Sequence, residues 1–121
     1  MTGTPASVVE AAFRHYRSQD REAAQPLYAE DFTFTSPQDD RIDKETYFRR
    51  CFPTADRFGE QRLLHVTPAD GELVFAHYEY ELATGGRYRN VEAITVRDGL
   101  IREVQVFFGG RQPDPKAPVV P

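Results

Sequence analysis

The chain has 121 residues, 40% of them hydrophobic, and a formal net charge of −4. This length suits one domain with a substantial core and excludes two ordinary domains. Because 15 basic and 19 acidic residues are mixed along the chain, no basic stripe marks a nucleic-acid-binding surface.

Cysteine usage and hydropathy point to a cytoplasmic protein that contacts neither nucleic acid nor membrane. The single Cys51 cannot form an internal disulfide, which fits a reducing compartment. Residues 1–6 lack the charged and apolar regions of a signal peptide, and no apolar run approaches the length of a membrane span. No Cys/His spacing resembles a zinc site, and no motif suggests a metal, nucleotide or covalent cofactor.

The first half of the chain is predicted to be mainly helical. Thr4 and Pro5 form a helix start, and apolar residues recur after them with helical spacing. Pro26 implies a kink or an early stop in the next helix. In chain order, this half is predicted to contain a helix over residues 5–18, a helix over 21–28, a short strand over 32–35, a polar turn over 38–40 and a helix over 44–52.

The second half is predicted to be a set of consecutive antiparallel strands. Its segments are rich in β-branched and aromatic residues that alternate with period two. The strands are predicted over residues 61–67, 73–82, 87–96 and 100–108, the last two joined by a three-residue loop over 97–99. The resulting order predicts an α+β domain over residues 1–110, in which a strongly curved, mostly antiparallel sheet wraps around three helices. Residues 111–121 are a proline-rich tail.

The register of the central hairpin decides which polar groups meet, and two alternatives remain open. With a two-residue turn at Gly85 and Gly86, Glu79 lies opposite Glu92; with a four-residue loop, His77 lies opposite Glu92. Either register gathers the same polar residues on one face: His77, Glu79, Asn90 and Glu92.

The order of these elements and several short segments resemble the nuclear-transport-factor-2-like superfamily. Within it they resemble the SnoaL-like group, which includes polyketide cyclases, ketosteroid isomerases and limonene epoxide hydrolases. The matching segments are residues 27–37, the helix after Asp43, the hairpin 96–101 and the strand end 106–109, within a likeness that spans 7–109. The resemblance implies a cone-shaped half-barrel whose concave face holds a small apolar or aromatic ligand. It also implies a homodimer formed through the convex face of the sheet.

By this likeness, each strand face takes one role. The expected lining of the cone is Phe75, His77, Glu79, Asn90, Glu92, Val104, Val106 and Phe108. The expected dimer face is Tyr78, Tyr80, Val91, Gln105 and Phe107. Ser36 stands where ketosteroid isomerases carry their base, so that particular activity is not expected. Glu92 matches the carboxylic acid of their oxyanion side.

The residues themselves support acid–base chemistry at one end of the cone. An imidazole near a carboxylate suits general-base work, and a carboxyl group beside another acid can be held protonated. We therefore predict His77 as base and Glu92 as acid, with Tyr16, Ser36, Tyr47, Tyr88 and Asn90 offering polar groups to a ligand. The predicted function is that of an isomerase, cyclase or hydrolase. The alternative is a non-catalytic ligand-sensing or dimerisation domain, in which His77 is structural.

Overall fold

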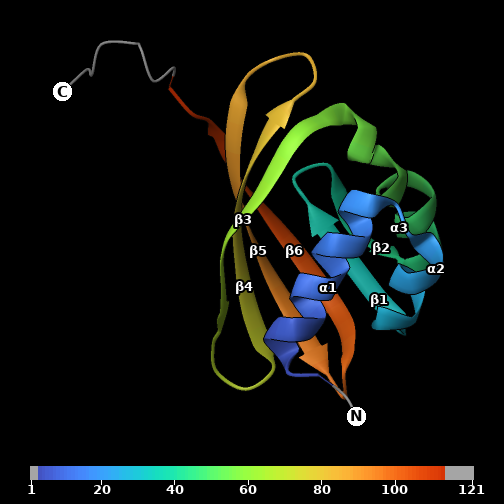
Figure 1. Ribbon diagram of the computed structural model, residues 1–121. Helices are drawn as coiled ribbons and strands as arrows, with labels where there is room; N and C mark the ends of the chain where they lie inside the picture. The colour runs from blue at the N-terminus through green and yellow to red at the C-terminus, as the bar shows by residue number, and fades with distance from the viewer. Residues whose placement is uncertain (1–2, 114–121) are drawn as a thin grey trace.

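The structure is a computed structural model that describes residues 3–113. An open, strongly curved sheet of six strands forms one layer, and the helices all lie on one side of it (Figure 1). This arrangement confirms the predicted α+β class. The predicted tail over residues 111–121 lies mostly outside the described residues.

The helical elements occur where caps and prolines place them. α1 (Pro5–Ser18) begins at Thr4, whose side chain accepts a hydrogen bond from the Ser7 amide, and ends at Gln19 in the left-handed conformation. The predicted second helix is cut short at Pro26. The remaining elements are α2 (Arg21–Ala24), the 3₁₀ helix η1 (Gln25–Leu27), α3 (Lys44–Arg50) and the 3₁₀ helix η2 (Phe52–Arg57). Within residues 3–113, no helix is long and apolar enough to cross a membrane.

The six strands include one that the sequence did not predict. They are β1 (Tyr28–Ser36), β2 (Asp39–Asp43), β3 (Phe58–Pro68), β4 (Leu73–Leu82), β5 (Arg87–Arg97) and β6 (Leu100–Arg111). The segment predicted as a polar turn over 38–40 begins β2. The sequence does not indicate β2 as a strand, because an edge strand with exposed polar side chains lacks apolar alternation.

The sheet is mixed, with the order β2-β1-β6-β5-β4-β3. Its only parallel pair among the described strands is β1 with β6, which brings the first and last strands together at the middle. All other neighbours are antiparallel, as predicted. The β5–β6 loop has two residues rather than three, because Arg97 pairs with Leu100 and both Asp98 and Gly99 take positive φ.

The β4–β5 register differs from both predicted alternatives. Glu81 pairs with Arg87, so five residues separate the last paired positions. A one-residue change of register exchanges the two faces of a strand. Ala76 therefore lies opposite Glu92, and Tyr78 lies opposite Asn90. The prediction that His77 and Glu79 share a face with Glu92 is wrong.

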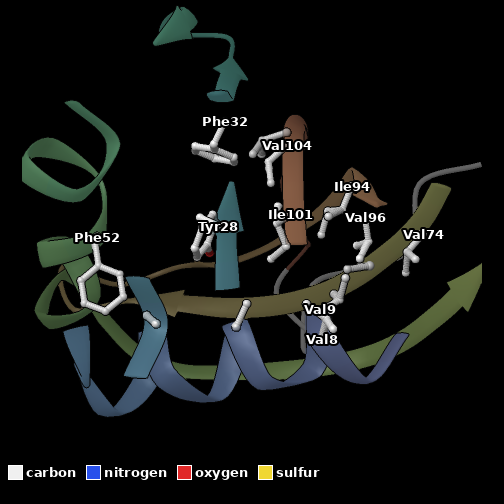
Figure 2. Packing of buried hydrophobic residues seen from close by; sticks show 14 of the residues in the cluster. Val8, Val9, Tyr28, Phe32, Phe52, Val74, Ile94, Val96, Ile101 and Val104 are labelled. Carbon is white, nitrogen blue, oxygen red and sulfur yellow. The ribbon is translucent and has the colours of Figure 1, made fainter. Parts of the chain in front are cut away.

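The core lies between the sheet and the helices, from α1 to η2 (Figure 2). Val9 on α1, Phe32 on β1 and Val74 on β4 are almost completely buried. Ile94 and Ile101 pack beside them from β5 and β6. Ile94 and Ile101 fill the space near the β5–β6 turn, so the remaining space lies towards the other end of these strands.

Candidate functional site

A cavity of about 620 Å³ lies between the sheet and the helices. Its volume falls within the range of small-molecule sites in proteins. The helical side contributes Ala12, Phe13, Tyr16, Tyr47, Arg50, Cys51, Thr54 and Arg57. The sheet contributes Tyr28, Phe34, Ser36, Gln38, Asp39, Phe58, Gln61, Tyr78, Tyr80, Leu82, Asn90, Glu92, Ile94, Ile101, Val104, Val106 and Phe108.

One end of this cavity is closed and the other opens to solvent. The buried Ile94, Ile101 and Val104 form the closed end. At the other end, called the mouth here, Arg57 is exposed and Phe108 is 50% exposed. Strand directions explain this geometry. The last residues of β1, β4 and β6 and the first residues of β3 and β5 all lie at the same end of the sheet.

A polar network on the sheet wall holds Glu92. The Tyr78 hydroxyl donates to Glu92 Oε2 at 2.7 Å, and the Asn90 amide nitrogen donates to the Tyr78 hydroxyl at 3.3 Å. The Asn90 oxygen in turn accepts from the Tyr80 hydroxyl and the Gly109 amide, both at 3.4 Å. Asn90 is 5% exposed, so these partners satisfy a buried amide and fix the direction of the Tyr78 proton.

Burial raises the pKa of Glu92 to about 7, and the Tyr78 hydrogen bond opposes that rise. The side chain lies deep beneath protein atoms but keeps accessible surface towards the cavity. No side chain within residues 3–113 hydrogen-bonds to its second oxygen, Oε1. Glu92 therefore offers one oxygen to a ligand and changes its protonation state near neutral pH.

Phenol groups surround this carboxyl group. Burial is the main cause that raises the pKa of Tyr16 to about 12 and of Tyr28 and Tyr47 further, and the charge of Glu92 adds to each. The Thr54 hydroxyl donates to the Cys51 carbonyl at 2.7 Å, so Tyr16 is the donor in its 2.8 Å bond to Thr54. These phenols stay protonated and line the cavity as weakly polar walls.

A second polar group joins β1 and β2 to α3 at the cavity. Asp39 and Arg50 form an ion pair at 3.2 Å, and the Ser36 hydroxyl donates to Asp39 at 3.3 Å. Cys51 lies beside them, and burial is the main cause that raises the pKa of its thiol to about 11. The thiol is therefore protonated at neutral pH and is no nucleophile.

Most of the predicted ligand-binding residues do line the cavity. They are Tyr16, Ser36, Tyr47, Asn90, Glu92, Val104, Val106 and Phe108. Tyr88 does not line the cavity; its ring stacks on Tyr80 with centroids 5.6 Å apart. The remaining predictions, Phe75, His77 and Glu79, lie on the convex face.

The predicted base is on the wrong side of the sheet for this cavity. His77 pairs with Val91, and its Nδ1 lies 3.3 Å from Nδ1 of His65 on the neighbouring strand. Glu79 is held by Arg89 at 2.9 Å and Arg62 at 3.0 Å, which lower the pKa of its carboxyl group. Neither residue meets Glu92, so the predicted acid–base pair is not formed.

Sequence reasoning missed Tyr78 and Tyr80 because it placed them on the convex face. A usable signal was present: the even-numbered positions of β4, from Val74 to Leu82, carry no charged residue, whereas the odd-numbered ones include Glu79 and Glu81. A strand face without charge is the one that faces a core. Arg57 and Asp39 carried no comparable signal, because both lie in irregular or edge segments.

Among known proteins, the SnoaL-like domain family matches residues 9–104. The chain belongs to this family, as its sequence predicted. No curated protein matches the chain significantly in sequence.

Solved structures with this fold come from several bacteria. An NTF2-like protein of unknown function from Cytophaga hutchinsonii is 19% identical, with a TM-score of 0.73 over 89% of this chain and 92% of that one. A protein from Kribbella flavida is 22% identical, with a TM-score of 0.74 over 84% of each chain. An LEH-like epoxide hydrolase from M. tuberculosis is 18% identical, with a TM-score of 0.70 over 88% and 84%. At these identities the likeness shows the shared fold.

Proposed function

We propose that the protein binds a compact, mainly apolar or aromatic molecule in the cone and transfers a proton at its polar end through Glu92. The observation that carries this proposal is a cavity-facing carboxyl group with a pKa near 7 and one oxygen that no side chain of residues 3–113 hydrogen-bonds. A general acid or base works best when its pKa lies near the working pH. The reaction class is isomerisation, cyclisation or hydration.

The Glu92 carboxyl group suits both directions of proton transfer. When protonated, it can donate from Oε1 to a carbonyl or epoxide oxygen of the ligand. When ionised, it is stabilised by the Tyr78 hydroxyl and can accept a proton from carbon or from water. Apolar walls from Ile94, Val104 and Val106 exclude water and strengthen these interactions.

Replacement of Glu92 by Gln tests the proposal, because the amide keeps a donor but transfers no proton. We would incubate the protein with cyclic ketones in D₂O and follow exchange at the α-carbon by NMR. Epoxides would be assayed in parallel for hydrolysis, since one structural neighbour is described as an epoxide hydrolase. We expect Glu92→Gln to reduce turnover at least about a hundredfold, with ligand affinity largely kept.

Glu103→Gln is the matched control, because Glu103 lies outside the cavity lining on the neighbouring strand β6. It should leave turnover unchanged. Equal activity of Glu92→Gln and wild type would contradict the acid–base role. Ligand binding without any turnover, and with no dependence on pH between 5 and 8, would instead favour the non-catalytic alternative.

We also propose that two copies associate through the convex face of the sheet. Phe107 is 55% exposed and Phe75 is 40% exposed there, and exposed apolar patches of this kind mark interaction surfaces. Val91 lies between them in the register, on the same face. Sedimentation at micromolar concentration should give twice the chain mass, and Phe107→Asp should shift it to the monomer; a monomeric wild type would contradict this.

A further inference from the structure

We propose that the natural ligand carries a carboxylate, or a similar planar anion, which Arg57 binds at the mouth of the cavity. This inference rests on the proposed ligand site and specifies the chemical class of the ligand. It assigns the ligand two distinct ends: an anionic end at the mouth and a neutral polar end at Glu92.

The backbone holds Arg57 at the mouth of the cavity. Arg57 is the last residue of η2, and its carbonyl accepts a hydrogen bond from the Ala83 amide at 2.8 Å. That bond ties the end of η2 to the β4–β5 hairpin. The next residue, Phe58, packs edge-on against Tyr80 in the cavity wall, with ring centroids 5.1 Å apart. The position of Arg57 beside the opening is therefore part of the fold.

The guanidinium group of Arg57 is available to a ligand. Within residues 3–113 it forms neither an ion pair nor a side-chain hydrogen bond, and the residue is exposed while lining the cavity. Arg50, the other arginine of the lining, is already paired with Asp39 at 3.2 Å. Of Arg50, Asp39 and Arg57, only Arg57 therefore lacks an ion-pair partner among residues 3–113.

The charges of the cavity lining do not cancel. Arg50 and Asp39 form an ion pair and Glu92 is about half protonated at pH 7, so Arg57 leaves the lining residues with a net positive charge. This local charge opposes the formal charge of −4 on the whole chain. The charges of Asp39, Arg50 and Arg57 all affect the pKa of the Cys51 thiol, so these groups lie around one side of the opening. A planar guanidinium group at such a position matches a carboxylate through two parallel hydrogen bonds.

The size of the cavity limits the rest of the ligand. A volume of about 620 Å³ with aromatic and aliphatic walls accommodates a monocyclic or bicyclic body. With Arg57 at the mouth, the structure therefore favours an amphipathic ring acid over a neutral hydrocarbon.

The test compares each acid with its neutral amide, which has nearly the same shape. We would measure Kd by titration calorimetry for benzoate against benzamide and 2-naphthoate against 2-naphthamide, at pH 6, where Glu92 is mostly protonated. We expect at least one acid to bind about tenfold tighter than its amide. The preference should shrink as salt is added, because the pair is partly exposed.

Arg57→Ala should remove the acid preference and leave amide affinity unchanged within about twofold, whereas Arg57→Lys should keep part of it. Arg49→Ala is the control, because Arg49 faces Glu45 on the outer surface of α3 and does not line the cavity. Equal affinities for acid and amide, an acid preference that survives Arg57→Ala, or no binding by any of the four compounds at millimolar concentration would overturn the proposal.

The same titrations with Glu92→Gln separate this inference from the proposed catalytic role. Acid preference that persists in Glu92→Gln supports the Arg57 site even if the protein shows no turnover. Turnover of neutral ketones without any acid preference would overturn the Arg57 site and leave the role of Glu92 standing.

Discussion

At the scale of single residues, Tyr78 lowers the pKa of Glu92 against the larger effect of burial. Its hydroxyl donates to Oε2 at 2.7 Å and therefore stabilises the ionised carboxylate. Tyr78→Phe removes this donor from a buried site without changing the shape of the wall. We expect the pKa of Glu92 to rise by about one pH unit, because a hydrogen bond to a charged group contributes about 1.5 kcal/mol or more.

The measurement is a ¹³C NMR titration of the Glu92 carboxyl carbon in wild type and in Tyr78→Phe. Tyr80→Phe serves as the control, since the Tyr80 hydroxyl reaches Glu92 only through Asn90 and Tyr78. A titration curve that does not move in Tyr78→Phe would show that desolvation alone sets the acidity of Glu92.

At the scale of elements, the register of β4 and β5 separates the cavity from the convex face. His77 lies opposite Val91 and contacts His65, on the side away from Glu92. His77→Ala should therefore leave ligand affinity and any turnover within about twofold of wild type, because surface changes away from a site have small effects. Loss of turnover in a folded His77→Ala protein would contradict the observed register.

The β4–β5 and β5–β6 hairpins together show how far sequence reasoning reaches. Alternation in 87–96 and 100–108 correctly grouped Asn90 and Glu92 with Val106 and Phe108. The two-residue turn alone would place Glu92 opposite Gln105, but a register shift between Thr95 and Val96 brings Glu92 opposite Val106. The five-residue connection after Glu81 leaves several registers open, and each change of one residue exchanges the faces. The fold was predictable from the order of elements. Which face of β4 lines the cavity, and therefore whether His77 or Tyr78 meets Glu92, depended on the length of the β4–β5 loop.

At the scale of the whole molecule, Glu92 links stability to pH. Its pKa is raised from 4.5 to about 7 in the folded state, so the folded protein binds this proton more tightly than the unfolded chain. The resulting stabilisation is complete below about pH 4.5 and is lost as the pH rises through 7. The loss is at most about 3 kcal/mol, from 1.36 kcal/mol per pH unit.

Chemical denaturation at several pH values checks this dependence. Between pH 5 and 8, the free energy of unfolding of wild type should fall relative to that of Glu92→Gln, which carries no proton at this position. Glu79 changes the stability with pH in the opposite direction. Its pKa is lowered in the folded state, so its stabilisation is present above its pKa in the unfolded chain and is lost as the pH falls. Parallel curves for wild type and Glu92→Gln would show that Glu92 ionises as easily in the folded state as in the unfolded chain.

The parallel pairing of β1 with β6 also has a consequence for synthesis on the ribosome. The contact between Asp31 and Arg102 joins residues 71 positions apart, and β1 has no neighbour on that side until β6 exists. The β1–β2 hairpin is translated early, but it joins the rest of the sheet only through β6 and must wait for that strand. Long-range pairing of this kind slows folding. Until β6 is made, β1 has no sheet to join, and a chain stopped before β6 cannot bury Phe32 in the core that includes Ile101.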